Sequence, residues 1–131
     1  MATQLIFIAI GGSLGCVLRF GVSNMIQNSA GASFPWGTFA VNIIGSFFIG
    51  FLAEMFDAVI VPSQWRSFAT IGFLGGFTTF STFTFETLNL LREKEYLYAF
   101  GNILASNVVG IAAVVAGIFA FRIIYKLTTG N

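Results

Sequence analysis

The sequence contains no histidine and a single cysteine, Cys16, which lies in an apolar run. Metal sites built from histidine and cysteine are therefore excluded, as is catalysis by a thiol–histidine or serine–histidine pair. The sequence has no phosphate-binding loop, and its six basic residues are nearly balanced by five acidic ones. We therefore expect no enzymatic activity, no nucleotide and no nucleic acid partner. Cys16 is expected to be a packing residue.

Charge is scarce as well. Only 8% of the 131 residues are charged, whereas 56% are hydrophobic, and a soluble domain carries about 25% charged residues. The ten-residue segments of alternating polarity that a β-barrel needs are absent. These features predict an all-α integral membrane protein in a lipid bilayer. The apolar run starts at Leu5 with no basic segment before it, so we expect the first span to be retained.

Four membrane spans account for most of the chain. A span needs about 20 apolar residues, so four spans use about 80 residues and leave only short loops. The predicted helices are Leu5–Ile26, Trp36–Phe56, Gln64–Leu91 and Tyr96–Leu127. We therefore expect a single four-helix transmembrane domain over residues 1–131. Small residues four apart predict close helix packing: Gly11 with Gly15, Ser46 with Gly50, and Ala113 with Gly117.

The basic residues show no preference for one side of the membrane. With four spans, both termini and the second loop lie on the same side. The tally is three against three: Arg66, Arg122 and Lys126 on that side, and Arg19, Arg92 and Lys94 on the other. Since the positions of lysine and arginine normally set orientation, the balance permits dual topology, with two copies pairing as an antiparallel homodimer. A weak but real bias is the alternative.

The third span is unusually polar. Between Gly72 and Glu86 it holds three glycines and five hydroxyl side chains. Hydroxyls and free backbone groups at membrane depth are tolerated where protein or water covers them, so this segment is predicted to line a pathway. The glycines each weaken a helix by about 1 kcal/mol and predict a break at Gly75–Thr78. Carbonyls freed there could bind a monovalent cation; a simple kink is the alternative.

Polar residues in the other spans are further candidates. Arg19 lies about 15 residues into the first span, where a charge is a functional hypothesis, although its side chain could instead extend to the headgroups. Asn42 lies in the second span, and Asn102 and Ser106 share one face of the fourth. Together with the hydroxyls of the third span they predict a polar track. Hydrogen bonding between helices is the alternative for each.

Two phenylalanines lie beside this track. Phe80 and Phe83 are three residues apart and share a helix face, which Glu86 continues. The edge of a phenyl ring is electropositive and can meet an anion. A phenylalanine stripe at helical spacing is nevertheless more often a packing feature than a site.

Three motifs resemble those of the Fluc (CrcB) fluoride-channel family of bacteria. They are Gly11-Gly12-x-x-Gly15-x-x-x-Arg19, Gly37-Thr38-x-x-x-Asn42-x-x-Gly45, and the run from Gly72 to Phe83 with Gly75-Gly76-Phe77-Thr78-Thr79-Phe80 at its centre. The resemblance covers essentially the full length. It implies an antiparallel dual-topology homodimer that exports fluoride passively through two pores in the inner (plasma) membrane and so gives fluoride resistance.

The resemblance also implies roles for residues near the break. Phe80 and Phe83 correspond to the pore phenylalanines, and Asn42 to an amide that donates to fluoride. Ser81 and Thr82 fall on the polar track of the third helix.

Further roles follow for the other helices. Ser106 resembles the hydroxyl of the fourth helix, and Arg19 the arginine near the vestibule. The backbone carbonyls of Gly75 and Thr78 from both subunits would hold a structural Na⁺ at the dimer interface. Some family members carry tyrosine where this chain has Asn102, so the contribution of the fourth helix is not fixed by the resemblance.

Two other functions remain open on the sequence. A proton-coupled multidrug exporter of the small four-helix dual-topology type needs a titratable acid inside the bundle, whereas Glu54 and Glu86 lie near span ends. We expect Glu86, one turn beyond Phe83, to face a pore mouth. A structural membrane subunit would not need an internally polar third helix.

Overall fold

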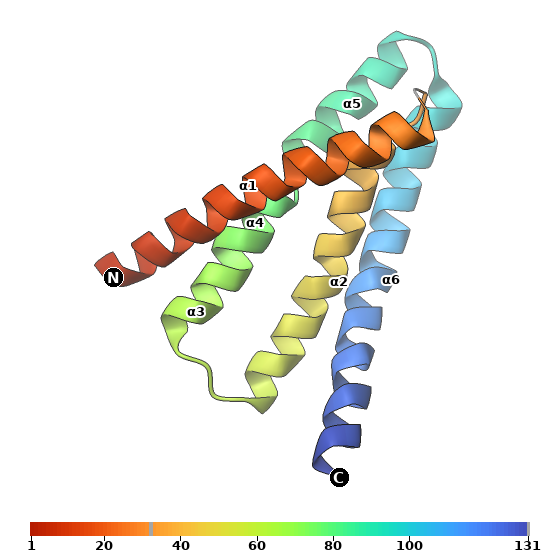
Figure 1. The fold of residues 1–131 in the computed structure, drawn as a ribbon. Helices are drawn as coiled ribbons and strands as arrows, with labels where there is room; N and C mark the ends of the chain where they lie inside the picture. Colours follow the sequence, from red (N-terminus) through yellow and green to blue (C-terminus); the bar gives the residue numbers. More distant parts are fainter. Residues whose placement is uncertain (32, 131) are drawn as a thin grey trace.

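The computed structural model describes residues 1–31 and 33–130, and these residues form helices joined by short connections (Figure 1). Three of the helices are long and apolar enough to cross a membrane: α1 (Ala2–Ala30), α2 (Trp36–Ala58) and α6 (Tyr96–Thr129). The predicted starts of α2 and α6 are confirmed. Both ends of α1 and the C-terminal ends of α2 and α6 extend a few residues beyond the predicted ends. The prediction depended on apolar residues, and the helices continue past them.

The most extensive contact joins α2 to α6, which lie side by side in Figure 1. Glycine makes the approach possible on both helices: a methyl group at Gly50 would collide with the carbonyl of Val114, and one at Gly117 with the carbonyl of Phe47. Small residues allow such close backbone contact in membranes. The predicted packing role of Gly50 and Gly117 is therefore confirmed.

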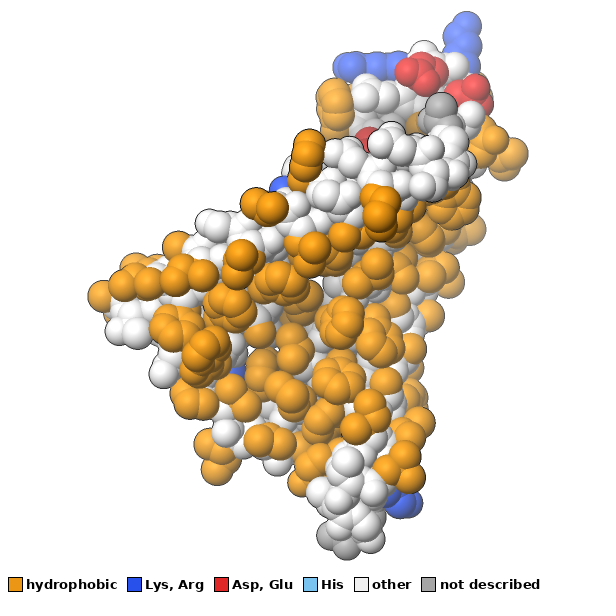
Figure 2. Space-filling model, viewed as in Figure 1, with side chains coloured by type: hydrophobic (Ala, Val, Ile, Leu, Met, Phe, Trp, Pro, Cys, Tyr) orange, Lys and Arg blue, Asp and Glu red, His pale blue; other side chains and the backbone are white. Residues whose placement is uncertain are grey.

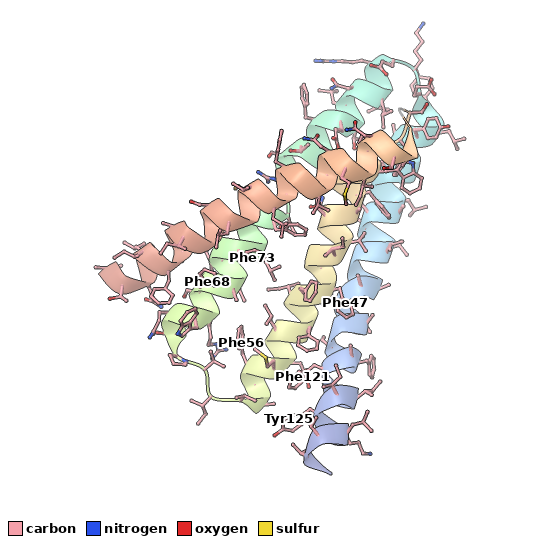
Figure 3. The ribbon with its side chains drawn as sticks, viewed as in Figure 1. Phe47, Phe56, Phe68, Phe73, Phe121 and Tyr125 are labelled. Carbon is pink, nitrogen blue, oxygen red and sulfur yellow. The ribbon has the colours of Figure 1, made fainter. Side chains whose placement is uncertain are left out.

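A second glycine interface joins α1 to the first half of the third span. Gly11 and Gly15 lie against the backbone of η1 (Phe68–Leu74), a π-helical segment. Gly76, just beyond η1, lies equally close to the backbone of α1. Figure 3 shows Phe68 and Phe73 on the side of η1 that α1 crosses. The prediction that Gly11 and Gly15 serve close packing is confirmed.

The third span consists of several short elements. After α3 (Ser63–Ser67) and η1, the three-residue helix α4 (Gly75–Phe77) leads to a break, and α5 (Phe80–Arg92) follows. Thr78 and Thr79 are extended, with φ/ψ of −91°/160° and −151°/119°. The predicted break near Gly75–Thr78 is therefore confirmed, and it lies at the end of that range and one residue beyond it. Packing of Gly72 and Gly76 against α1 holds the preceding residues helical, and the chain opens at the two threonines that follow.

Charged side chains lie toward both ends of the molecule. The α1–α2 and α5–α6 connections lie at one end, whereas the α2–α3 connection and the C terminus lie at the other (Figure 1). Hydrophobic side chains cover most of the face in Figure 2, and charged side chains gather at the end with the α5–α6 turn. A wide apolar band between polar ends is the surface expected of a protein in a bilayer.

Candidate functional site

Asn42 binds the broken backbone of the third span. Its Nδ2 donates to the carbonyl of Thr79 at 3.0 Å, and its Oδ1 accepts from the backbone N–H of Thr79 at 2.8 Å. Backbone groups at membrane depth need such substitutes when a helix is interrupted. The second hydrogen of the Asn42 amide remains available as a donor, so its role as a fluoride ligand stays a prediction.

Thr79 also starts the next helix. It is the N-cap of α5, and its hydroxyl accepts from the backbone N–H of Thr82 at 3.2 Å. The Thr79 hydroxyl further lies 3.0 Å from that of Thr82 and 3.4 Å from that of Ser81. The structure thus places both predicted track residues, Ser81 and Thr82, around one capping threonine. Thr84 is different, because its hydroxyl bonds the carbonyls of Phe80 and Ser81 on its own helix.

Arg19 reaches the same break from α1. Its Nη1 donates to the carbonyl of Thr78 at 3.2 Å, and Nη2 lies 3.8 Å from the sulfur of Cys16. A cavity of about 340 Å³ on one side of the break is lined by Asn42 and Thr78, and one of about 320 Å³ on the other by Arg19 and Thr82. Of the two alternatives left open for Arg19, the structure favours a place at the break over extension to the headgroups.

Phe80 and Phe83 contact one another at the start of α5. Their ring centroids lie 5.8 Å apart with 43° between the planes, which confirms that they share a face. Phe83 is half-buried, whereas Phe80 is 75% exposed on this chain. A large ring this exposed, beside a run of hydroxyls, is available to line a pathway or to meet another surface.

Glu86 lies one turn further along α5. Its Oε1 accepts a 2.8 Å hydrogen bond from the hydroxyl of Thr38 on α2. Its Oε2 is buried and has no hydrogen-bond donor among the described residues. Glu86 also lines a cavity of about 480 Å³ with Asn24 and Glu93, toward the end of the molecule with the α5–α6 turn. Its place at a pore mouth stays a prediction.

Sequence reasoning missed Thr38 as a site residue. Thr38 is 4% exposed and is the only residue whose hydrogen bond to the Glu86 carboxylate is seen in the described ranges 1–31 and 33–130. The signal was present in the Gly37-Thr38 pair of the second-helix motif. Spacing alone could not relate it to Glu86, because the two residues are 48 positions apart.

Ser106 and Asn102 share one face of α6, as predicted. The hydroxyl of Ser106 donates to Oδ1 of Asn102 at 3.2 Å, and Nδ2 of Asn102 donates to Thr87 on α5 at 3.0 Å. Asn107 instead donates to the carbonyl of Ile103 on its own helix. Ser106 therefore belongs to a network between α5 and α6, and its part in a fluoride pathway stays a prediction.

Two backbone carbonyls near the break, those of Gly75 and Thr78, are the candidate ligands for the predicted cation. The N–H of Thr79, which would continue the helix by donating to the carbonyl of Gly75, donates to Asn42 instead. The Gly75 carbonyl is thus freed, and Gly75 and Thr78 line the same cavity of about 340 Å³. The Thr78 carbonyl has two lone pairs, of which Arg19 engages one. Neutral oxygens of this kind are those that bind monovalent ions in broken membrane helices.

The fold and the site define a class: a helical multi-pass membrane protein with polar groups gathered at a broken helix. The comparisons with known proteins narrow this class. Residues 6–118 match the family model described as CrcB-like protein, Camphor Resistance (CrcB). The chain therefore belongs to the CrcB family, as the three motifs indicated.

Similar curated proteins are fluoride channels of bacteria. The chain is 46% identical to the fluoride-specific ion channel FluC of Geobacter sp. (strain M21), over 91% of this chain and 97% of the relative. It is 48% identical to FluC of Geotalea daltonii over the same shares. FluC of Parabacteroides distasonis is 46% identical over 88% of this chain and 90% of the relative.

Proposed function

We propose that this protein is a fluoride-specific passive channel of a bacterial inner membrane. The observation that carries the proposal is the 46% identity to a fluoride-specific channel over 91% of this chain and 97% of the relative. The aligned length is nearly the whole chain, so it is long enough to include the broken span and the polar groups around it. This chain also has polar groups gathered at a broken helix, which a pathway for fluoride through a membrane needs.

The driving force requires no nucleotide. Hydrogen fluoride enters a cell as a neutral acid and dissociates in the less acidic cytoplasm, and the membrane potential then drives the anion out. A potential of 100 mV supplies about 2.3 kcal/mol per charge, which supports roughly a fiftyfold gradient. A passive fluoride channel therefore needs only a selective path for one anion.

The working form is proposed to be an antiparallel homodimer with four crossings per subunit. The fourth crossing would be the segment from α3 to α5, which runs from Ser63 to Arg92. A second subunit would cover the Phe80 ring, which is 75% exposed on this chain beside hydroxyl groups. The balanced basic residues support copies in both orientations.

Two pores, each lined by both subunits, are proposed to pass along the start of α5. The edges of Phe80 and Phe83 would contact the ion, and the free N–H of Asn42 would donate to it. Ser81, Thr82 and Ser106 would offer hydroxyls in place of water. Phe80, Ser81, Thr82 and Phe83 lie within two turns of the break. Asn42 bonds the break from α2, and Glu86 with Thr38 would form one mouth.

A structural Na⁺ at the dimer interface is part of the proposal. Its ligands would be the carbonyls of Gly75 and Thr78 from each subunit. A cation between the subunits would offset the partial negative charge of four carbonyl oxygens. Arg19, which donates to the carbonyl of Thr78, would add a fixed positive charge near the path of the anion.

The experiment is fluoride efflux from liposomes that contain the purified protein. An imposed voltage without a pH gradient should release fluoride and leave chloride inside, because a channel carries one net charge per ion. A proton-coupled carrier would instead need the pH gradient, and one-for-one symport of fluoride with a proton would be electrically silent. Failure of a voltage alone to drive fluoride from protein that is folded and dimeric would overturn the proposal.

A further inference from the structure

A buried polar network joins α5 to α6 beside the proposed pathway. Asn102 is 1% exposed, and its Nδ2 donates a 3.0 Å hydrogen bond to the hydroxyl of Thr87. That hydroxyl donates in turn to the carbonyl of Phe83 at 2.8 Å. Ser106 donates to the Oδ1 of Asn102 at 3.2 Å. Four residues thus form one chain of hydrogen bonds from α6 to the backbone of Phe83.

Each group in this network has a defined task. A hydroxyl has one hydrogen to give, and Thr87 gives it to Phe83, so its oxygen accepts from Asn102. Thr87 is only 7% exposed, and together with Asn102 it forms a buried pair with little access to water. Replacing Thr87 by an apolar residue would leave the Nδ2 of Asn102 without its acceptor. Replacing Asn102 would remove the donor to Thr87 and the acceptor of Ser106.

Few other contacts fix the rotation of α5, the helix that this network joins to α6. The extended residues Thr78 and Thr79 separate α5 from α4, so the rotation of α4 does not determine that of α5. α5 packs mainly against α6 and has little contact with α2. Its polar links are those of Thr79 to Asn42, Glu86 to Thr38, and Thr87 to Asn102.

We infer that Asn102 is a positioning residue which, through Thr87, fixes the rotation of α5 about its own axis and hence the direction of the Phe83 ring. The inference rests on the proposed function, since this direction matters for transport only if Phe83 lines a fluoride path. The Asn102–Thr87 bond is suited to the task because it lies one turn beyond Phe83. There it acts on the same backbone that carries the ring.

If the role of Asn102 is purely structural, a different result is expected. Asn102 could be needed only because a buried asparagine must be bonded, and replacing both members of a buried pair by apolar groups of similar shape can then be nearly neutral. The double variant Asn102→Leu/Thr87→Val separates the two roles. It removes the tether to α6 and leaves neither of the two side chains unsatisfied. The Ser106 hydroxyl, which loses the Oδ1 of Asn102, can turn to a carbonyl of its own helix.

The experiment measures fluoride efflux per folded dimer, the fluoride-to-chloride ratio and thermal unfolding for each variant. We expect Asn102→Leu and Thr87→Val alone to lower the unfolding temperature, and the double variant to recover most of it. Flux in the double variant should stay about tenfold below wild type, the factor that corresponds to about 1.4 kcal/mol. Recovery of flux together with stability would overturn the inference.

Two controls and one further combination make the result specific. Thr87→Ser keeps both hydrogen bonds and should keep wild-type flux, and so should Asn107→Leu, because Asn107 bonds only its own helix. Adding the double change to Phe83→Ile should cost little further flux, since the ring it positions is already gone. Independent, multiplying losses would overturn the inference. Absence of fluoride efflux in wild-type protein would instead overturn the proposed function.

Discussion

Asn42 and Thr79 exchange two hydrogen bonds, at 3.0 Å and 2.8 Å, across the point where the third span opens. A side-chain amide has the same donor and acceptor as a peptide group, so Asn42 accepts from the N–H of Thr79 in place of the carbonyl that an unbroken helix would provide. Its amide also gives a second hydrogen bond to the Thr79 carbonyl, which starts α5. The break is therefore built jointly by α2 and the third span. It depends on a residue 37 positions away from it.

Replacing Asn42 tests this joint construction. Asn42→Leu leaves the N–H of Thr79 unbonded, at about 1–3 kcal/mol for a buried group, removes one of the two hydrogen bonds to its carbonyl, and should clearly lower thermal stability. Asn42→Gln keeps both the donor and the acceptor on a longer side chain and should lower stability less. Thermal unfolding in detergent measures both. Equal stability of Asn42→Leu and wild type would show that the break is held by other contacts.

Two glycines on α6 give a matched pair. A methyl group at Gly117 would collide with the Phe47 carbonyl, whereas one at Gly101 would meet nothing within 4 Å. Alanine favours a helix over glycine by about 1 kcal/mol. Gly101→Ala should therefore leave the unfolding temperature unchanged or raise it, and Gly117→Ala should lower it. The same sign of change for both would contradict the α2–α6 packing.

The phenylalanines test the anion path. Phe80→Ile and Phe83→Ile keep most of the apolar volume and remove the ring edge, so each should abolish or strongly lower fluoride flux in liposomes. Size-exclusion chromatography should still show the folded dimer. Phe48→Ile, on another exposed ring of the chain, is the control and should leave flux intact. Full flux in both test variants would mean that the two rings are packing residues.

Glu86 separates a channel from a carrier. Glu86→Gln keeps an oxygen that can accept the 2.8 Å hydrogen bond from Thr38 and removes the group that a proton carrier would titrate. A passive channel should retain substantial flux driven by voltage alone. Loss of flux in folded Glu86→Gln dimers, together with dependence on a pH gradient in wild type, would support the carrier.

Orientation is tested by labelling one terminus. Because the basic residues balance, we expect a terminal tag to be accessible from each side of the membrane in different molecules. Adding two or three lysines to one terminus should bias insertion and lower fluoride efflux. Co-expression of a copy biased the other way should restore it. One orientation in every molecule would rule out the antiparallel dimer.

The sequence predicted the helices well because apolar spans are long and local. It also predicted that Phe80 pairs with Phe83 and Asn102 with Ser106, since spacing along a helix determines which side chains meet. The break falls at the end of the predicted range, at Thr78 and Thr79, because Gly76, a weak helix former, is held helical by contact with α1. The links of Thr38 to Glu86 and Asn102 to Thr87 join separate helices, and no periodicity within one segment contains them.

The π-helical segment Phe68–Leu74 has a consequence for the length of the chain. The N–H of Gly75 donates five residues back, to the carbonyl of Thr70, so this segment holds more residues per turn than an α-helix. Deleting one residue here can close the segment to an ordinary α-helix and keep Gly76 against α1 and Thr79 against Asn42. Deleting a residue from a regular α-helix such as α2 would instead turn everything that follows by about 100°. The segment Phe68–Leu74 is thus the part of this span that can absorb a change of one residue in length.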